Sequence, residues 1–368
     1  MVYADNAATT KLDIEAFEVM KPFLLELYSN PSQPYSFSRD SKKALKEARS
    51  IIAGCIGADP EEIFFTSGGT ESDNWAIKNA GNGGGVVTSV IEHHAVLNSC
   101  LSYERAGGKV SYVDVDKKGI VDLADLEDKI DESTRLVSVM FANNEIGTIQ
   151  PISQLAKVAH KHGCLFHTDA VQAIGHVNIN VHELDVDLLS ASAHKFNGPK
   201  GIGFLFIKKG TEIYPYIDGG SQESGLRAGT ENVASIVAMA VALKKNCKRI
   251  AENEQKLLML ENKLIDGLDV LKIDYIRNGA ERRIPGNISL SFKGHEGEVI
   301  LHRMDLMGIC ISTGSACDSI NTKLSHVISA IGVPDEYASG TIRISLGKDN
   351  KESDIEVILS ALNRILNQ

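Results

Sequence analysis

Short apolar stretches alternate with helical patterns between about residue 60 and residue 210. Several of these stretches are near-continuous runs rich in Val, Ile and Phe, which is typical of strands covered on both faces. Residues 122–130 and 151–163 have helical patterns, and the second opens with Pro and closes on Gly, as helices often do. We therefore expect an α/β layered region with strands at 63–66, 86–90, 109–115, 135–142, 164–170 and 201–207.

The pattern changes after this region. Residues 231–268 have the pattern of one long helical stretch, long enough to bridge two domains. Beyond it, strand-like and helix-like segments are mixed, as in a smaller α+β unit, at 287–292, 296–305, 340–347 and 354–366. Because 368 residues are many for one compact core, we expect a large domain with a smaller one appended.

Composition excludes several classes of protein. A hydrophobic fraction of 43% and a charged fraction of 23% are ordinary for a soluble globular chain. The formal net charge of -10 disfavours a nucleic-acid binder, which needs a basic surface. The N-terminus lacks a basic start followed by an apolar core, and no apolar run approaches a membrane span, so we expect a cytoplasmic protein. The six cysteines form no CxxC pair, which fits neither a disulfide scaffold nor a zinc site.

Some polar residues follow the predicted strands. Gly69 and Thr70 lie between the strand at 63–66 and a predicted helix, where backbone N–H groups can approach a phosphate; an ordinary turn and cap has the same pattern. Asp169 lies at the end of the strand at 164–170, where the binding crevice of an α/β sheet opens. A carboxylate there can hold a cationic pyridinium nitrogen, or it can simply form a turn.

The chain also offers nucleophiles and bases. Lys195 lies among small residues and turn formers after an apolar stretch, an unusual place for a solvated lysine, and a neutral amine there can form a Schiff base. Cys317 lies in a Gly/Ser-rich stretch typical of an exposed loop, as a reactive thiol or as a cysteine without a role. His93 and His94 suit either proton exchange at an aromatic cofactor or a helix start. Arg343, alternating with apolar neighbours, suits a substrate carboxylate or a surface ion pair.

A series of motifs runs through nearly the whole chain: YADNAATT (3–10), SNPS (29–32), FTSGGTESDN (65–74), EHHAVL (92–97), NNEIG (143–147), HTDAVQ (167–172), SAHKFNGPKG (191–200), RAGTEN (227–232), STGSAC (312–317) and IRISLG (342–347). Their order resembles that of the cysteine desulfurases, pyridoxal 5'-phosphate (PLP) enzymes of fold type I in the class V aminotransferase group. The resemblance implies an α/β fold: a large PLP-binding domain at 14–255 with a mostly parallel mixed sheet. It also implies a small α+β domain, formed by 1–13 and 256–368, with a mobile catalytic-cysteine loop at about 312–326.

The resemblance assigns roles to individual residues. Lys195 resembles the Schiff-base lysine, Asp169 the partner of the pyridinium nitrogen, and His93 the ring-stacking acid/base, which leaves His94 incidental. Cys317 resembles the nucleophile that receives the sulfur. The other matching positions are Asn144 and Gln172 at the pyridoxal ring oxygen, Gly69, Thr70, Ser192 and His194 at the phosphate, Thr230 at the neighbouring subunit's phosphate, and Asn30 and Arg343 at the substrate carboxylate.

The resemblance also implies a homodimer with active sites at its interface, and a reaction in which L-cysteine becomes L-alanine. The sulfur passes to Cys317 as a persulfide and then to an acceptor, such as an iron–sulfur scaffold protein or a thiolation enzyme. The spacing from Cys317 to 325–332 resembles the NifS/IscS-like group rather than the SufS-like group. Two departures affect these expectations: Tyr35 and Ser38 alter the substrate-side loop, and the chain stops at Gln368, where housekeeping members carry an extension that docks an iron–sulfur scaffold.

Rival interpretations remain. Selenocysteine lyase, cysteine-sulfinate desulfinase and aminotransferase reactions use the same scaffold, and dependence of the activity on Cys317 discriminates between them and a desulfurase. A non-catalytic sulfur-relay or scaffold protein is disfavoured by the intact set of Lys195, Asp169, His93 and Cys317. A nucleotide-binding dehydrogenase is disfavoured because the glycine fingerprint is missing.

Overall fold

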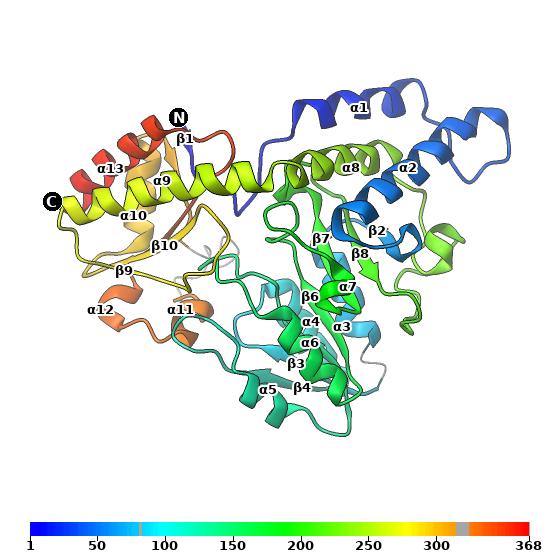
Figure 1. The fold of residues 1–368 in the computed structure, drawn as a ribbon, viewed down its shortest axis with the longest axis horizontal. Coiled ribbons are helices and arrows are strands. Elements are labelled where there is room, and N and C mark those ends of the chain that lie inside the picture. The colour runs from blue at the N-terminus through cyan, green and yellow to red at the C-terminus, as the bar shows by residue number, and fades with distance from the viewer. Residues whose placement is uncertain (81–82, 314–323, 368) are drawn as a thin grey trace.

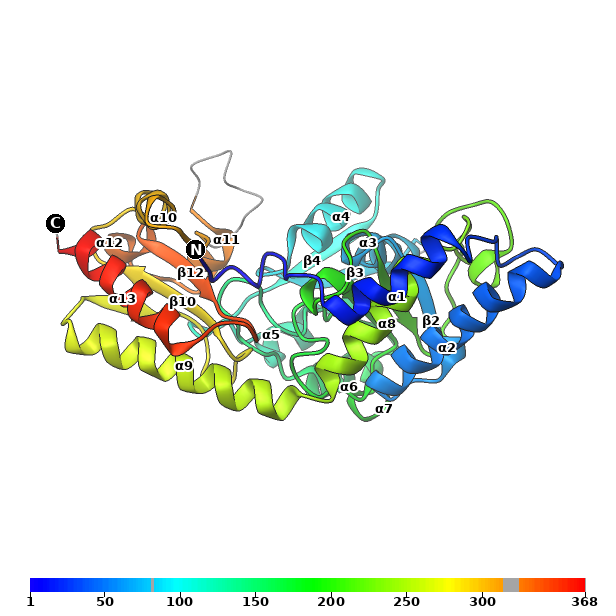
Figure 2. The same ribbon diagram turned by 90° about the horizontal axis from the view of Figure 1, so that it is seen from above.

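The computed structural model describes residues 1–80, 83–313 and 324–367. Two lobes are visible, one built on a seven-stranded sheet and the other on a three-stranded sheet (Figures 1 and 2). Helix α8 (Val233–Cys247) packs on the larger lobe, and α9 (Ile250–Val270) runs along the smaller one. The predicted domain boundaries at residues 13 and 255 stay a prediction.

The seven-stranded sheet is mostly parallel and mixed, which confirms the predicted fold class. Its order is β2-β8-β7-β6-β5-β3-β4, and β8 runs antiparallel to both of its neighbours. The strands are β2 (Ile63–Thr66), β3 (Gly85–Ser89), β4 (Lys109–Val113), β5 (Thr134–Ser138), β6 (Leu165–Asp169), β7 (Leu188–Ser192) and β8 (Gly203–Ile207). The carboxyl ends of β6 and β7 therefore meet at one edge of the sheet.

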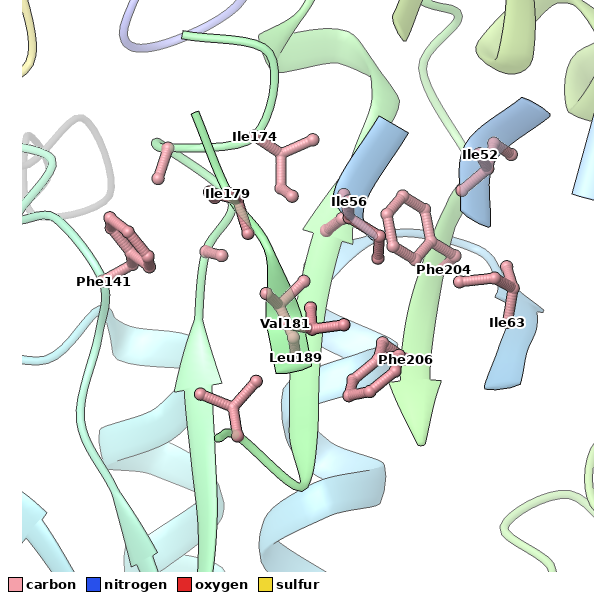
Figure 3. Packing of buried hydrophobic residues seen from close by; sticks show 14 of the residues in the cluster. Ile52, Ile56, Ile63, Phe141, Ile174, Ile179, Val181, Leu189, Phe204 and Phe206 are labelled. Carbon is pink, nitrogen blue, oxygen red and sulfur yellow. The ribbon is translucent and has the colours of Figure 1, made fainter. Parts of the chain in front are cut away.

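Both faces of this sheet are covered by helices, which explains the continuous apolar runs. Successive residues point to opposite faces, so Leu188 packs in the cluster beside α3 (Gly69–Ala80) and α4 (His94–Arg105), while Leu189 packs in the main core. Figure 3 shows that core, where Phe204 and Phe206 of β8 meet Ile52 and Ile56 of α2 (Arg39–Ile56). The remaining helices of this lobe are α1 (Ile14–Leu25), α5 (Leu123–Lys129), α6 (Ile152–Lys161) and α7 (Val181–Leu184).

The smaller lobe is α+β. Its antiparallel sheet has the order β12-β10-β9, and a second cluster of buried residues joins it to the helices. The chain's start belongs to this cluster, because β1 (Val2–Tyr3) pairs with β11 (Ile309–Cys310). The elements are β9 (Tyr275–Arg277), β10 (Asn287–Phe292), α10 (Gly297–Leu306), α11 (His326–Ala330), α12 (Asp335–Ala338), β12 (Thr341–Ser345) and α13 (Glu352–Leu366).

Some predicted elements differ from the structure. The prediction of a single helical stretch at 231–268 is wrong. The stretch divides into α8 and α9 at Arg249, whose backbone dihedral angles leave the helical region. No Gly or Pro marks this break. The strand predicted at 135–142 ends at Ser138, and beyond it the N–H group of Met140 bonds to the carboxylate of Glu92. Strand β7 was not predicted, because its Ser- and Ala-containing sequence lacks β-branched residues.

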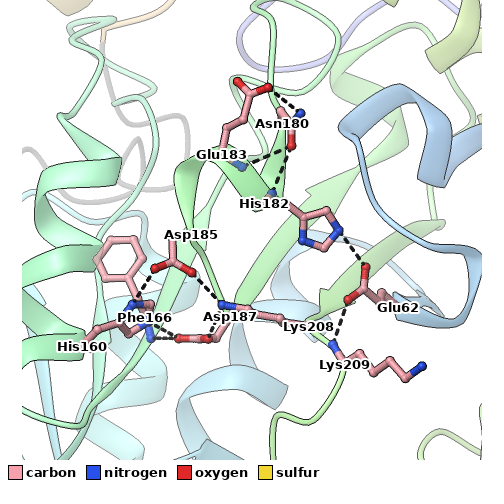
Figure 4. A network of polar contacts seen from close by, with 10 residues as sticks. All are labelled: Glu62, His160, Phe166, Asn180, His182, Glu183, Asp185, Asp187, Lys208 and Lys209. Atoms are coloured by element: carbon pink, nitrogen blue, oxygen red, sulfur yellow. Dashed lines mark hydrogen bonds and ion pairs between the residues drawn. The ribbon is translucent and has the colours of Figure 1, made fainter.

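The amino-terminal edge of the large sheet holds structural ion pairs (Figure 4). Asp187, just before β7, accepts hydrogen bonds from the N–H of Phe166 at 2.8 Å and from Nε2 of His160 at 2.7 Å. Lys208, just after β8, pairs with Asp185 at 2.6 Å. These polar groups have partners within the fold, so we assign them a structural role. Ligand sites of α/β sheets lie at the opposite edge, at the carboxyl ends of the parallel strands. Every helix in the described ranges is too short or too polar to cross a membrane.

Candidate active site

A pocket of about 260 Å³ opens at the carboxyl ends of β6 and β7. The start of α3, the connections before α4 and after β5, and the segment after β1 add to its wall, as do α11 and β12 of the smaller lobe. The structure brings most of the predicted site residues together in its lining: Gly69, Thr70, His93, Asn144, Asp169, Gln172, Ser192, His194, Lys195 and Arg343. Their gathering at this edge follows the rule for ligand sites in α/β sheets.

Lys195 follows β7 in a short 3₁₀ turn, Ala193–Lys195. Its Nζ donates hydrogen bonds to the carbonyl oxygens of Ala7 at 2.6 Å and Ala8 at 2.9 Å. Gln172 also donates to Ala7, at 3.0 Å. The N-terminal segment thus fixes both side chains. Ala7 and Ala8 belong to the YADNAATT motif, but the motif gave no sign that they contact Lys195 and Gln172.

Asp169 is the last residue of β6 and is only 5% exposed. Its Oδ1 accepts a hydrogen bond from the N–H of Val171 at 2.9 Å. Burial raises the pKa of Asp169 to about 6, against the opposing effects of that hydrogen bond and of Lys195. At neutral pH the carboxylate is therefore ionised, and it faces a pocket where a cationic group would relieve its desolvation.

His93 caps the start of α4. Its Nδ1 accepts a hydrogen bond from the N–H of Ala95 at 3.1 Å, so the proton of the neutral ring lies on Nε2. Burial, with the charges of Lys195, His94 and His326, lowers the pKa of His93 to about 4. The ring is therefore neutral at physiological pH, and Nε2 is its remaining hydrogen-bond donor.

The start of α3 forms an anion cradle. A side chain at Gly69 would place its Cβ 2.5 Å from Cγ2 of Val171, so only glycine lets the helix end approach this wall. Thr70, Ser192 and His194 line the same pocket. Burial lowers the pKa of His194 to about 4, with Lys195 contributing. The N–H groups of the first turn and the dipole of a helix start suit a phosphate.

Arg343 lies in the pocket wall on β12, and is only 2% exposed. It donates to Oδ1 of Asp5 at 2.8 Å and to the carbonyl oxygen of Asn144 at 3.0 Å. The alternative of a surface ion pair is wrong, since burial of this side chain is nearly complete. Asp5 was not predicted as its partner, because the two residues are far apart in sequence.

Three predicted residues do not lie in the pocket lining that the structure describes. Asn30 uses its Oδ1 to accept a hydrogen bond from the N–H of Ser32 at 2.8 Å. Thr230 is exposed. Cys317, with most of the predicted loop at 312–326, lies outside the described residues.

The pocket also contains residues that the sequence interpretation missed. His94 and His326 line it with their rings in edge-to-face contact, 5.1 Å between centroids, although His94 was expected to be incidental. Glu145 and Asp73 line it too. His94 lies in the motif EHHAVL and Asp73 in FTSGGTESDN. Their place in these motifs was the feature of the sequence that could have predicted them as pocket residues.

Comparison with known proteins identifies the family. The aminotransferase class-V family model matches residues 2–358. The chain belongs to this family. A cysteine desulfurase IscS of Dictyoglomus turgidum is 48% identical over 371 residues, covering 99% of this chain and 94% of that protein. The predicted membership of the cysteine desulfurases is thus confirmed.

Solved structures agree. A NifS-like protein superimposes with a TM-score of 0.93 at 39% identity, covering all of this chain and 99% of the other. The structure of SspA in complex with cysteine matches with a TM-score of 0.84 at 34% identity, covering 94% of this chain and 99% of the other. Both confirm the fold-type-I architecture expected from the motifs.

Proposed function

We propose that this protein is a PLP-dependent cysteine desulfurase that converts L-cysteine to L-alanine and passes the sulfur to an acceptor. The observation that carries the proposal is the convergence, in one pocket, of a lysine amine, a buried ionised carboxylate and a neutral histidine beside a helix-end anion cradle. The relatives named as cysteine desulfurases and the neighbour that holds cysteine support it.

The residues present fit PLP. The cradle at Gly69 suits its phosphate, Asp169 its protonated ring nitrogen, and Lys195 its aldehyde carbon. When bound, PLP supplies an electron sink for negative charge at the α-carbon of an amino acid. The donor His93 would lie against the ring, as predicted from the motifs.

The chain's own groups perform the remaining steps. Lys195 would move the proton at the α-carbon of the substrate, and Arg343 would bind the substrate carboxylate through paired N–H donors. The thiolate of Cys317 would attack the substrate sulfur; the S–S bond forms as the carbon–sulfur bond breaks, and a proton returned to carbon completes alanine. The sulfur remains on Cys317 as a persulfide.

Two variants with matched controls test this assignment. Lys195→Ala should abolish both the aldimine absorbance band of the PLP-loaded protein and alanine release, whereas the exposed Lys200→Ala should retain both. Cys317→Ser should keep the band and lose alanine release from L-cysteine, whereas Cys310→Ser should retain both. Alanine release that persists in Cys317→Ser would point to a lyase, and a wild-type protein that binds no PLP would refute the proposal.

We further propose that the protein is a homodimer and that its acceptor is an iron–sulfur scaffold protein or a thiolation enzyme. Thr230 is exposed and lies outside the pocket of its own chain, which supports a contact with the neighbouring subunit's phosphate site. Light scattering on the purified protein tests the dimer. In that dimer, Thr230→Ala should weaken PLP binding; an unchanged dissociation constant would remove this role.

A further inference from the structure

A cluster of carboxyl groups lies in the wall of the pocket and behind it. Asp73 of α3 is 1% exposed, Glu92 before α4 is fully buried, and Asp169 of β6 is 5% exposed. The proposed chemistry uses only Asp169. Three ionised carboxyl groups in a low-dielectric interior would repel one another and would each lose their hydration, so the fold must set which of them carries a charge.

Asp73 lies in surroundings that give a negative charge little support. Its Oδ1 is buried and has no hydrogen-bond partner among the described residues. Nε2 of His167 is 3.7 Å away, beyond hydrogen-bond reach. That ring bonds to Ser138 at 2.8 Å and Ser190 at 2.9 Å, and burial lowers the pKa of His167 to about 3, so it carries no positive charge.

Glu92 is in a similar position. Its Oε1 accepts hydrogen bonds from the hydroxyl of Ser89 at 2.5 Å and the N–H of Met140 at 2.9 Å. Its Oε2 is buried without a partner in the part of the chain that the structure describes. Burial raises the pKa of Glu92 to about 8, and the nearby Asp169 adds to the rise. Burial and the same neighbour also raise the pKa of Asp73 well above its usual range; Glu92 adds to the rise, and a contact with the hydroxyl of Ser190 opposes it only in part.

Asp169 differs from both in having a cation nearby. It accepts one backbone N–H, from Val171, as Glu92 does from Met140, but only for Asp169 does Lys195 favour the charged form.

Other titratable groups near the cluster are His167 on β6, His93 before α4 and Cys100 on α4. None of these three offers a positive charge at neutral pH, because burial lowers the pKa of both histidines and raises the pKa of the thiol. His94, His326 and Glu145 line the same pocket, and the ring of His326 contacts the carbonyl oxygen of Glu92 rather than its carboxyl group.

We propose that Asp73 and Glu92 are held as neutral carboxylic acids, so that Asp169 carries the single negative charge of the cluster and alone pairs with the ring nitrogen of PLP. The two acids are positioning residues, since they act through Asp169. Only the final clause, on pairing with PLP, rests on the proposed function; the protonation states are properties of the chain itself.

Asp73→Asn and Glu92→Gln test the protonation states, because each keeps the shape of the neutral acid. In infrared difference spectra of the PLP-loaded protein at pH 7, wild type minus each variant should show the carbonyl band of a protonated carboxylic acid. Asp169→Asn, the matched control, should instead remove a carboxylate band. Raising the pH of the wild type through about 8 should abolish the Glu92 band. A carboxylate band lost in either neutral-acid variant would overturn the inference.

Binding of PLP supplies the second readout. Asp73→Asn and Glu92→Gln should change the dissociation constant of PLP by less than about twofold, whereas Asp169→Asn should weaken binding by about tenfold or more. A tenfold loss in Asp73→Asn or Glu92→Gln would show a lost charge, and would overturn the inference. If wild-type protein bound no PLP, the proposed function would fail, and the infrared bands of the apo protein would still decide the protonation states.

Discussion

Replacing Glu92 by Gln should change how the stability of the fold depends on pH. The amide oxygen of Gln can accept the same hydrogen bonds from Ser89 and Met140, while the titrating proton disappears. In the native protein burial raises the pKa of Glu92 from 4.5 to about 8, whereas in the unfolded chain the group ionises at its ordinary value. Between these two pH values the native state holds a proton that the unfolded state has released.

The sign follows from this difference. Wild-type stability, relative to Glu92→Gln, is highest below about pH 4.5 and falls as the pH rises to about 8. Each pH unit in this window is worth ~1.4 kcal/mol, so the full change over about 3.5 units is about 5 kcal/mol. The difference is constant at still higher pH, since both states are then ionised.

Urea-induced unfolding of the apo proteins at half-unit steps from pH 5 to pH 9 measures this change. The free energy of unfolding of Glu92→Gln, minus that of wild type, should rise steadily up to about pH 8 and then level off. Glu26→Gln, at an exposed position, controls for the loss of one carboxylate and should give a nearly flat difference. A flat difference for Glu92→Gln as well would refute the reasoning, because Glu92 would then ionise normally in the fold.

Two further substitutions probe the cradle and the buried ion pair. Gly69→Ala should weaken PLP binding by about tenfold, because the new Cβ would lie 2.5 Å from Val171; Gly54→Ala, which meets nothing within 4 Å, should bind PLP as wild type does in the same titration. Glu223→Gln should lower the free energy of unfolding by about 3 kcal/mol, since Arg49 loses a buried partner held at 2.6 Å and 2.8 Å. Urea unfolding measures this loss, and a change below ~1 kcal/mol would contradict it.

Sequence patterns located strands best where burial covers both faces. The run at 63–66 predicted both ends of β2 correctly. Four consecutive apolar or neutral side chains between turn signals are too few for a helix and fit a buried strand. The break between α8 and α9 escaped prediction, since it depends on which lobe each helix packs against and not on a helix-breaking residue.

The candidate site could be predicted in its outline, through the motif order. Lys195, Asp169 and His93 were named from the sequence, and the structure brings them into one pocket. The contacts that tune them could not be predicted, because they join segments far apart in sequence: the amine of Lys195 donates to the carbonyl oxygens of Ala7 and Ala8, close to the start of the chain. Charge states of buried acids likewise depend on packing that no local pattern records.

The N-terminal segment has a consequence for the order in which the protein matures. Its strand β1 pairs with β11, and Asp5 pairs with Arg343, so its partners are synthesised long after the segment itself. Contacts of such long sequence separation form late in folding, after the earlier elements have collapsed. The carbonyl groups that hold Lys195 therefore reach their place only after β11 and β12 have been made. Capture of the cofactor in its final geometry accordingly depends on the docking of the N-terminal segment onto the smaller lobe.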